Sequence, residues 1–469
     1  MIMDDTSSRV RTESSATIKA FLSLTLFFVC QALPGAAHSG PLSVGAARVD
    51  ITALAHPNGI VPAIEFAHER LYMRAIVLDN GEARAALIGG DIGSFRNIWE
   101  IAAPLVSREF LIPVENLVMT GTHTHSSSIA GVTRAPEDVA NVVLEVVRMA
   151  NANMQSAKVG FAEGASYLNV NRDAVDAETR RWTQAANADF PSDKTTAVLA
   201  FYDEQGAPIA GYMNYAMHPV NGYQSGFVSA DFAGAASRHV EQAFGDSAVV
   251  IFTQGASGDQ NPLHLRTGTN VMAEVRGDVT VTGFELTREM VEGALRERRV
   301  ERGPNNPAAD LALKRWMDAQ GQVLGEEVIR VMSHMERLDG DVDMGAKQVL
   351  LTCPGRARVD SGGRGGPGTY ADGPDVDILL GFLGINEIAV TTVNAEVYNV
   401  IAQQVKAESP LSKTMVVTLA NGRAPSGYIV TDDAYGRETF QALGSRLKPG
   451  CAQTGIVNNL AGMIYEYVN

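Results

Sequence analysis

Apolar segments of strand length, each running into a polar loop, recur along this chain and constrain its fold more than any other feature. They mix β-branched and aromatic residues and end at Gly, Asn or Asp, which is typical of buried strands. We predict strands at 47–52, 72–80, 83–93, 116–123, 157–164, 195–203, 209–218 and 248–255. Apolar residues at helical spacing predict helices at 136–154, 231–245 and 284–300. Strands interleaved with helices favour an α/β fold, with a layered, mixed β-sheet core flanked by helices.

Length and composition fit one large globular domain. The chain has 469 residues, of which 45% are hydrophobic and 19% are charged. Its net charge of −15, without any Lys/Arg-rich block, argues against a nucleic-acid partner. We find no internal repeat and expect a single domain over 38–469. Within it, the polar stretch 301–345 and the Gly/Pro-rich stretch 360–375 predict an excursion over 301–375 that includes a mobile loop able to cover a site.

The N-terminus has the pattern of a signal peptide over 1–37. Three basic residues precede an apolar run at 20–33, which ends at Pro34 and the small residues "GAA". This run is about 14 residues long, too short for a comfortable membrane span. We therefore expect an exported, secreted or periplasmic protein without a stable transmembrane segment in the mature chain; an uncleaved anchor is the alternative. Cys353 and Cys451 then remain, and the sequence leaves open whether they form a disulfide.

Two histidine motifs follow predicted strands. "GTHTHSSS" places His123 and His125 one residue apart, and in an extended segment both side chains would point the same way. Two such imidazoles suit a metal site or acid–base chemistry, and a hydrogen-bonded polar turn is the alternative. His218 lies in "NYAMHPVN", before a proline that favours extended geometry. Alone, His218 is better explained as a hydrogen-bonded turn residue than as a ligand.

Three more polar stretches come after apolar runs. "FTQGASGDQNP" (252–262) has glycines that let backbone N–H groups approach a substrate, and it lacks the G-x-S-x-G pattern of a serine hydrolase. In "TVNAEVYN", a buried Glu396 would be costly unless it is paired or bound to metal. "SGYIVTDDAY" contributes Tyr428 and Tyr435, for which simple packing is the alternative.

Taken together, these motifs resemble the catalytic domain of the neutral ceramidases, secreted or membrane-attached zinc amidases that cleave the N-acyl bond of ceramide. The resemblance begins at "GAARVDIT", includes "ERLYMRAIVLD" and "GGDIG", and ends with "SGYIVTDDAY", so it covers most of 38–469. Several separated motifs in the same order are a far more specific signal than any one of them.

The resemblance implies a site for one Zn²⁺. The implied metal ligands are the first His of the T-H-T-H-S motif, the His of M-H-P, a Glu that here follows Ala in place of the family's Gly, and a Tyr: His123, His218, Glu396 and Tyr428. Three or four such ligands with an open position describe a catalytic zinc site. The resemblance also implies a substrate-facing His125, an Arg172 that binds an oxyanion or carboxylate, and Asp91 as a group supporting the ligands.

Two departures from the family leave the substrate open. Asn261 stands where the family has a serine that acts in catalysis. A carboxamide is not a nucleophile but can hydrogen-bond an oxyanion, so we favour attack by water that the zinc binds and activates. The family also has a C-terminal β-sandwich, which we do not expect in this chain, since it stops soon after "SGYIVTDDAY".

We therefore expect an exported zinc-dependent hydrolase of an amide or ester acyl bond, acting on a small-molecule or lipid-like acyl substrate. His125 would protonate the leaving group, and Arg172 and Asn261 would stabilise charge together with backbone N–H groups near Gly258. Asp259 and Tyr435 complete the expected substrate contacts. The alternatives are a true ceramidase that releases fatty acid from ceramide and a non-catalytic zinc-dependent binding protein.

Overall fold

The first layer of the fold is a five-stranded sheet. The computed structural model describes residues 39–56, 70–127, 135–223, 228–265, 307–336, 338–362, 364 and 366–469. Neighbouring strands of the sheet, in order, are β5 (Leu117–Gly121), β4 (Arg84–Gly90), β3 (Tyr72–Asp79), β2 (Ser43–Asp50) and β6 (Gln155–Ser156). The central strands β3 and β4 are buried along nearly their whole length. Burial on both faces explains their almost continuous apolar sequences.

Two four-stranded sheets and three small ones complete the described strands. The second sheet has the order β12 (Val249–Gln254), β11 (Pro208–Tyr215), β10 (Thr195–Tyr202) and β7 (Lys158–Ala165). The third has the order β15 (Met344–Arg358), β16 (Tyr370–Ile385), β17 (Ile388–Val393) and β19 (Lys413–Thr418). The small sheets join β13 (Gln260–Pro262), β8 (Asn169–Val175) and β9 (Trp182–Asn187); β18 (Glu396–Val397) and β20 (Tyr428–Ile429); and β1 (Gly40–Pro41) and β14 (Asp341–Val342).

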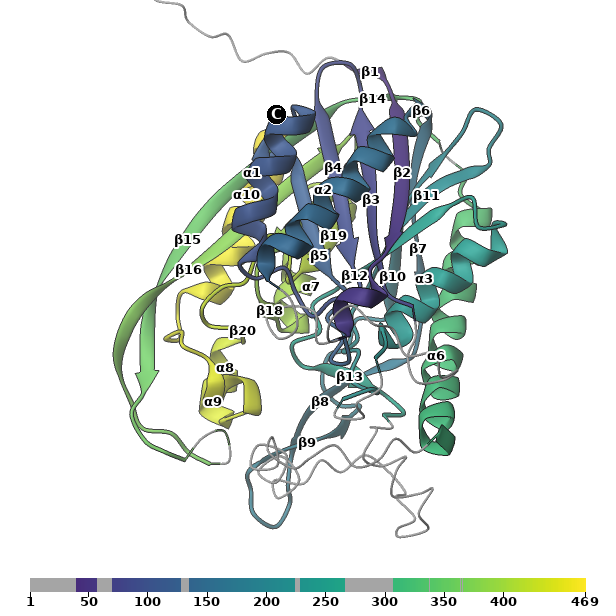
Figure 1. Ribbon diagram of the computed structural model, residues 1–469. Helices are drawn as coiled ribbons and strands as arrows, with labels where there is room; N and C mark the ends of the chain where they lie inside the picture. Colours follow the sequence, from purple (N-terminus) through teal and green to yellow (C-terminus); the bar gives the residue numbers. More distant parts are fainter. Residues whose placement is uncertain are drawn as a thin grey trace, which may run out of the picture. The chain divides into compact units, whose positions relative to one another are not determined.

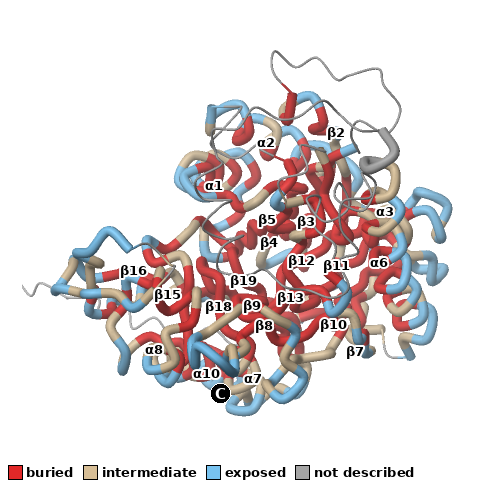
Figure 2. The backbone as a smooth tube through the Cα atoms, turned by 90° about the horizontal axis from the view of Figure 1, so that it is seen from below, coloured by how far each residue is buried: buried red, intermediate tan, exposed pale blue. Residues whose placement is uncertain are grey.

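Helices cover the outer face of each larger sheet. The first sheet packs against α1 (Ile98–Phe110) and α2 (Pro136–Ala152), the second against α3 (Asp231–Ala243) and α6 (Pro307–Ser333), and the third against α7 (Asn399–Glu408) and α10 (Ala452–Val468). Two short helices, α8 (Asp432–Arg437) and α9 (Phe440–Gly444), follow β20. Figure 2 shows α1 and α2 on one side of the strands and α7 and α10 on the other. The predicted α/β fold with layered mixed sheets is confirmed.

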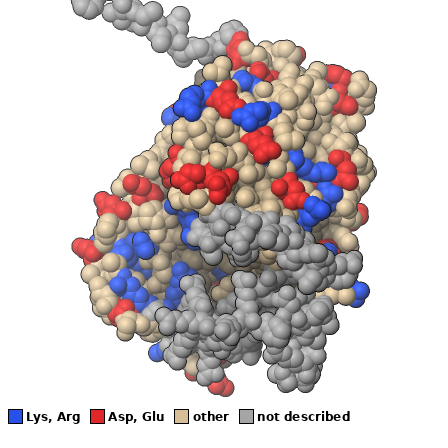
Figure 3. Space-filling view, viewed as in Figure 1, with Lys and Arg blue, Asp and Glu red and all other residues tan. Residues whose placement is uncertain are grey.

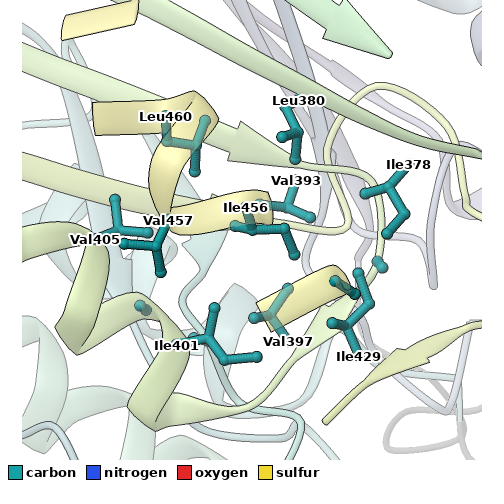
Figure 4. Close-up of a cluster of buried hydrophobic side chains, with 14 of the residues drawn as sticks. Ile378, Leu380, Val393, Val397, Ile401, Val405, Ile429, Ile456, Val457 and Leu460 are labelled. Atoms are coloured by element: carbon teal, nitrogen blue, oxygen red, sulfur yellow. The ribbon is translucent and has the colours of Figure 1, made fainter. Parts of the chain in front are cut away.

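A further apolar core lies between the sheets. It includes Leu87 of β4, Ile251 of β12 and Val417 of β19, all fully buried. Under α10, a separate cluster brings Ile456 close to Val393 of β17 (Figure 4). Each such aliphatic side chain contributes about 1.5–3 kcal/mol by leaving water. The sheets are therefore fixed on both faces, and the loops at their ends have a rigid base.

Parallel strand pairs determine where those loops meet. Each of the three larger sheets contains one parallel pair in the described residues: β4 with β5, β11 with β12, and β17 with β19. Parallel neighbours end at the same edge of a sheet, and ligands in layered α/β folds gather at that edge. The segments that follow these strands carry every metal ligand predicted from the sequence. In Figure 1 the ends of β5, β12 and β19 lie near β13 and β18.

Buried polar side chains join the strand ends across sheets. Asn421, after β19, accepts a hydrogen bond from Met119 N at 2.8 Å and donates Nδ2 to Leu117 O at 3.0 Å, so it holds β5. Thr418 Oγ1 donates to Gly255 O at 2.7 Å, after β12. Buried hydrogen bonds of this kind specify one arrangement, since leaving them unmade is costly.

Two described parts of the stretch 301–375, for which we predicted an excursion, are a long helix and part of a long strand. Helix α6 packs against α3, where a side chain at Gly321 would meet Phe232 O at 2.8 Å, so glycine permits a close approach. Its buried residues, such as Leu313, Leu324 and Val328, were hidden among polar neighbours. Part of the predicted mobile loop, residues 370–375, belongs to β16 and pairs with β15.

Other predictions for the chain ends and cysteines have mixed outcomes. Cys353 of β15 and Cys451 before α10 form a disulfide, which the sequence left open. The signal peptide 1–37 and the helix 284–300 lie outside the described residues. Residues 38–469 form one compact unit. In the part of the chain that the structure describes, no helix combines the length and apolarity needed to cross a membrane.

Candidate functional site

His123 lies in the loop after β5, where the backbone turns sharply. Its φ of 66° is in the left-handed region, so this segment is not extended as we expected. Such a conformation costs roughly 1–2 kcal/mol for a residue with a β-carbon. Two contacts to the segment after β4 offset that cost: His123 N donates to Ile92 O at 3.1 Å, and Nδ1 lies 3.2 Å from Gly93 O. Because a carbonyl only accepts, Nδ1 carries the proton and Nε2 presents a lone pair.

His218, in the segment after β11, is held in the same way. Its Nδ1 lies 3.1 Å from Gln260 O, and its backbone N donates to the same oxygen at 3.2 Å. Burial, with Arg172 nearby, lowers the pKa of His218 to about 4. His218 is therefore a neutral imidazole at physiological pH, protonated at Nδ1 and with a free lone pair at Nε2.

Three acceptor atoms converge on one point. Nε2 of His123 lies 3.2 Å from Nε2 of His218, and Oε2 of Glu396 lies 3.3 Å and 3.2 Å from these two nitrogens. With both imidazoles protonated at Nδ1, none of the three atoms has a proton to share, and such a buried arrangement needs a cation. Two ligand atoms at about 2.0–2.1 Å from a tetrahedral Zn²⁺ are about 3.3–3.4 Å apart. The three residues, called the ligand triangle below, therefore fit Zn²⁺.

Glu396 is the charged member of the ligand triangle, and Arg423 orients it. Arg423 Nη2 donates to Glu396 Oε1 at 3.1 Å, which leaves Oε2 for the triangle. Burial alone would raise the pKa of Glu396, but His123 and His218 beside it hold this pKa well below its usual range. Glu396 is thus a carboxylate, and the pairing that the sequence required for a buried acid is present.

His125 stands beside the ligand triangle, at an exposed position. Its ring centroid is 4.9 Å from that of His123 and 5.6 Å from that of Tyr223. Nitrogens of His123, His125 and His218 also lie within 4.8 Å of one another, so His125 is a possible third ligand by distance. Oε2 of Glu396 lies 3.2 Å and 3.3 Å from the two Nε2 atoms, which favours Glu396 as the candidate third ligand. Exposure suits His125 better to proton exchange with water or substrate.

Tyr428, Arg172 and Asn261 adjoin the ligand triangle on another side. Glu396 and Tyr428 are register partners across β18 and β20. Arg172 of β8 donates to Tyr428 Oη at 3.3 Å and to Asn261 Oδ1 at 3.3 Å. Burial and the Glu396 carboxylate raise the pKa of Tyr428 to about 12. The structure thus brings together all four predicted metal ligands, with Arg172 and Asn261 in contact with them or with each other.

The loop after β12 has a different role from the one expected for Gly258 and Asp259. Gly258 N donates to Val397 O at 2.8 Å, so this N–H is not available to an oxyanion. Asp259 accepts from Asn399 N and Asn171 Nδ2, both at 2.8 Å. Burial and nearby Asp173 raise the pKa of Asp259 to about 7. These contacts fit residues that anchor the loop and thereby position Asn261 and Arg172, whose Nη2 donates to Gly258 O at 2.6 Å.

Tyr435 and Asp91 make their contacts away from the ligand triangle. Tyr435 Oη lies 3.2 Å from Ser445 Oγ, and its ring packs under Arg356, 4.7 Å from the guanidinium carbon. Asp91 accepts from Arg74 Nη1 at 3.1 Å within a buried ion-pair network. The motif "GGDIG" does support the site, but through the carbonyls of Ile92 and Gly93 and not through the carboxylate of Asp91.

Sequence reasoning missed three arginines close to the ligand triangle. Arg423 binds Glu396, as described above. The guanidinium carbon of Arg364 lies 5.5 Å from the centroid of Tyr428, and Arg96 interacts electrostatically with Arg423 and Glu396. Each lies in a loop that has no strand pattern to place it. The one available signal was the occurrence of Arg423 close before the predicted ligand Tyr428 in "NGRAPSGY".

Comparison with known proteins supports the fold and gives no family assignment. No family model matches the chain. A solved structure described as a ceramidase complexed with C2 is similar over 91% of this chain and 75% of its own, with a TM-score of 0.67 and 15% identity. Neutral ceramidase from Pseudomonas aeruginosa has the same coverage, a TM-score of 0.64 and 14% identity. The ceramidase-like fold predicted from the motifs is therefore confirmed.

Proposed function

We propose that this chain is an exported zinc-dependent hydrolase that cleaves an acyl amide or ester bond. The observation that carries the proposal is the ligand triangle of His123, His218 and Glu396, whose three acceptor atoms lie 3.2–3.3 Å apart with no proton between them. The ceramidase-like fold supports the same reaction class. Tyr428 is the proposed fourth ligand, since it is the register partner of Glu396.

When bound, Zn²⁺ would polarise the scissile carbonyl and lower the pKa of a water ligand to about 7. Positioning and charge stabilisation fall to the chain itself. Arg172 is buried, and its Nε has no hydrogen-bond partner among the described residues, so it keeps a donor for a ligand. Asn261 has its Oδ1 bound by Arg172, which leaves its Nδ2 to donate to an oxyanion. His125 is the proton donor to the leaving group.

Ceramide is the second candidate substrate. It is favoured by the likeness in fold to a protein described as a ceramidase. Asn261 in place of the family's serine weighs against transfer of that activity, because a carboxamide supplies no nucleophile. A substrate panel should therefore contain ceramide beside simpler acyl amides and esters.

Export is supported by the disulfide between Cys353 and Cys451. Disulfides persist in oxidising compartments and are rare where thiols are kept reduced. The proposal combines this bond with the signal peptide predicted over 1–37. Cell fractionation tests it: export predicts a mature protein outside the cytoplasm, shortened at its N-terminus, and a full-length cytoplasmic protein would contradict it.

The experiment for the reaction uses the purified chain with its metal removed by a chelator and then restored. We expect hydrolysis of at least one acyl amide or ester to disappear with the metal and return with Zn²⁺. His218→Gln should abolish both zinc retention and turnover, whereas His334→Gln, an exposed histidine at the end of α6, should change neither. A protein that holds zinc and cleaves no member of the panel would be the non-catalytic binding protein instead.

A further inference from the structure

Four arginines lie near Glu396 or Tyr428, and together they are called the arginine group below. Arg172 donates to Tyr428 Oη at 3.3 Å, and the guanidinium carbon of Arg364 lies 5.5 Å from the Tyr428 centroid. Arg423 donates to Glu396 Oε1 at 3.1 Å, and Arg96 feels the charges of Arg423 and Glu396. All four guanidinium groups are thus linked to a metal ligand directly or through one neighbour.

Two members of the arginine group form no ion pair with any residue that the structure describes. Arg364 stacks on Phe440, with its guanidinium carbon 4.3 Å from the ring centroid, and forms no ion pair with a described residue. Arg96 likewise forms no ion pair in the described part of the chain. Partial burial and the like charge of Arg423 lower the pKa of Arg96. Like charges held close together are unfavourable unless a counter-charge arrives.

Nearby acids do not supply that counter-charge. Among the described residues, Glu396 is the one carboxylate in an ion pair with the arginine group, and its other oxygen belongs to the ligand triangle. Neither Asp173 nor Asp259 forms an ion pair with the arginine group among the described residues; burial raises the pKa of Asp173, and burial together with Asp173 raises that of Asp259. A bound divalent cation would add further positive charge. The site is therefore electropositive, although the whole chain carries a net charge of −15.

Charge is also distributed unevenly over the protein surface. Figure 3 shows Lys and Arg side chains gathered at the lower left, the part that Figure 1 labels β15, β16, α8 and α9. Higher on the same face, acidic and basic side chains are mixed. An electropositive region in an acidic protein concentrates anionic ligands and speeds their association.

We propose that the arginine group binds an anionic oxygen group of the substrate, a carboxylate or phosphate placed near the scissile bond. This proposal rests on the proposed function and names the substrate class of that site. Guanidinium groups match carboxylate and phosphate geometry with paired hydrogen bonds. An anionic lipid surface is less well matched, because Arg172 is buried and Arg423 has a side chain only 27% exposed, so they form no flat exposed patch.

A matched pair of substrates isolates the charge. N-lauroylglycine carries a carboxylate, and N-lauroylglycinamide has the same acyl amide with a neutral end. We expect kcat/KM to be roughly 10- to 100-fold higher for the acid, the range of one or two charge-assisted hydrogen bonds. Arg364→Gln and Arg96→Gln should each reduce that preference several-fold. Arg108→Gln, at an exposed arginine on α1, is the matched control and should preserve the preference.

A binding measurement separates this proposal from the proposed function. Calorimetric titration of the metal-free protein with the same two compounds needs no turnover. Tighter binding of the acid than of the amide, with this difference lost in Arg364→Gln, supports the anion site. If neither compound is cleaved but this result holds, the anion site stands and the proposed hydrolysis is wrong. Equal affinity for the acid and the amide, or no binding of either, overturns the anion site. A preference for the acid that is unchanged in both Arg364→Gln and Arg96→Gln also overturns it. Arginine-dependent binding to vesicles of anionic phospholipid, without a preference between the two amides, also overturns it.

Discussion

Two buried clusters of ionisable groups in this protein differ in a single respect, the balance of donors and acceptors. In the first, Arg74 of β3 donates to Asp91 at 3.1 Å and to Glu241 of α3 at 2.9 Å, and Tyr72 N adds a bond to Asp91 at 2.8 Å. In the second, the ligand triangle, two imidazoles and a carboxylate all present lone pairs to the same point. Both are deeply buried between sheets and helices.

This balance of donors and acceptors distinguishes a structural ion-pair network from a metal site. The acids beside Arg74, Asp91 and Glu241, accept hydrogen bonds from nearby donors. One oxygen of Asp91 is the exception, because it has no hydrogen-bond partner among the described residues. The ligand triangle has no donor at its centre, so burial is tolerated only if a cation is bound. We therefore propose that the first cluster contributes stability and that the second binds a metal, and four changes test this division.

Replacing a metal ligand should have the largest effect. In Glu396→Gln the charged corner of the ligand triangle becomes a neutral amide, so zinc affinity should fall by well over the roughly 10- to 100-fold typical of a supporting residue. Hydrolysis should fall with it. Competition with a chromophoric chelator measures the affinity, and Glu326→Gln, at an exposed glutamate paired with His239, is the control. Unchanged zinc affinity in Glu396→Gln would contradict the proposal that the ligand triangle binds the metal.

Breaking the other cluster should act on stability alone. Arg74→Met leaves Asp91 and Glu241 as buried acids without their main donor. Removing one partner of a buried ion pair typically lowers the free energy of unfolding by about 3–5 kcal/mol. Urea denaturation of the loaded protein measures this loss. If the folded variant also loses its zinc, the two clusters are coupled and the division is wrong.

Asp259 is intermediate between the two clusters, since it accepts hydrogen bonds from Asn399 and Asn171 but forms no ion pair among the described residues. Its contribution to the free energy of unfolding should depend on pH. Its pKa is raised to about 7 by burial and by Asp173. Between about pH 4 and 7 the unfolded chain releases this proton while the folded protein keeps it, so stability falls as pH rises, by up to about 1.4 kcal/mol per pH unit. Its contribution is fully present below about pH 4 and lost as pH rises through about 7.

Denaturation curves of Asp259→Asn across this pH range check the sign. The variant should lack the slope, so its stability relative to the parent rises with pH. The exposed Asp189→Asn should retain the parent's slope. If the difference in unfolding free energy between the unmodified protein and Asp259→Asn does not change between pH 4 and 7, Asp259 is ionised throughout this range. This outcome would contradict the expected pH dependence.

The smallest effect on metal should come from Asn261→Ser. Asn261 contacts Arg172 and no corner of the ligand triangle, so zinc content should stay the same. Turnover should change by less than in Glu396→Gln, because serine keeps a polar donor at this position. Metal analysis beside a kinetic assay measures both. Loss of zinc in this variant would mean that the loop after β12 belongs to the metal site itself.

The sequence predicted the fold where apolar runs were strong. The runs that became β3, β4, β10 and β12 lie close to their predicted bounds, because both faces of these strands are buried. Helix α1 was missed, since Pro104 within it argues against a helix, and long β15 was missed because most of its residues are only partly buried.

The convergence of the candidate ligands was predictable, but the atoms that orient them were not. His123, His218, Glu396 and Tyr428 were proposed as ligands from motifs that follow strands. Their partners Gly93 O and Gln260 O are backbone atoms, which carry no sequence signal. The left-handed backbone at His123 and the ion pair between Arg423 and Glu396 depend on how loops from different sheets meet. Contacts of this kind are set by tertiary packing and not by local pattern.

Anomalous diffraction at the zinc absorption edge, from crystals of the zinc-loaded protein, tests directly whether the ligand triangle binds zinc. We predict one strong peak beside the ligand triangle, about 2.0–2.2 Å from Nε2 of His123, Nε2 of His218 and Oε2 of Glu396. A loaded crystal with no peak there, or with its peak bound by other residues, would contradict it.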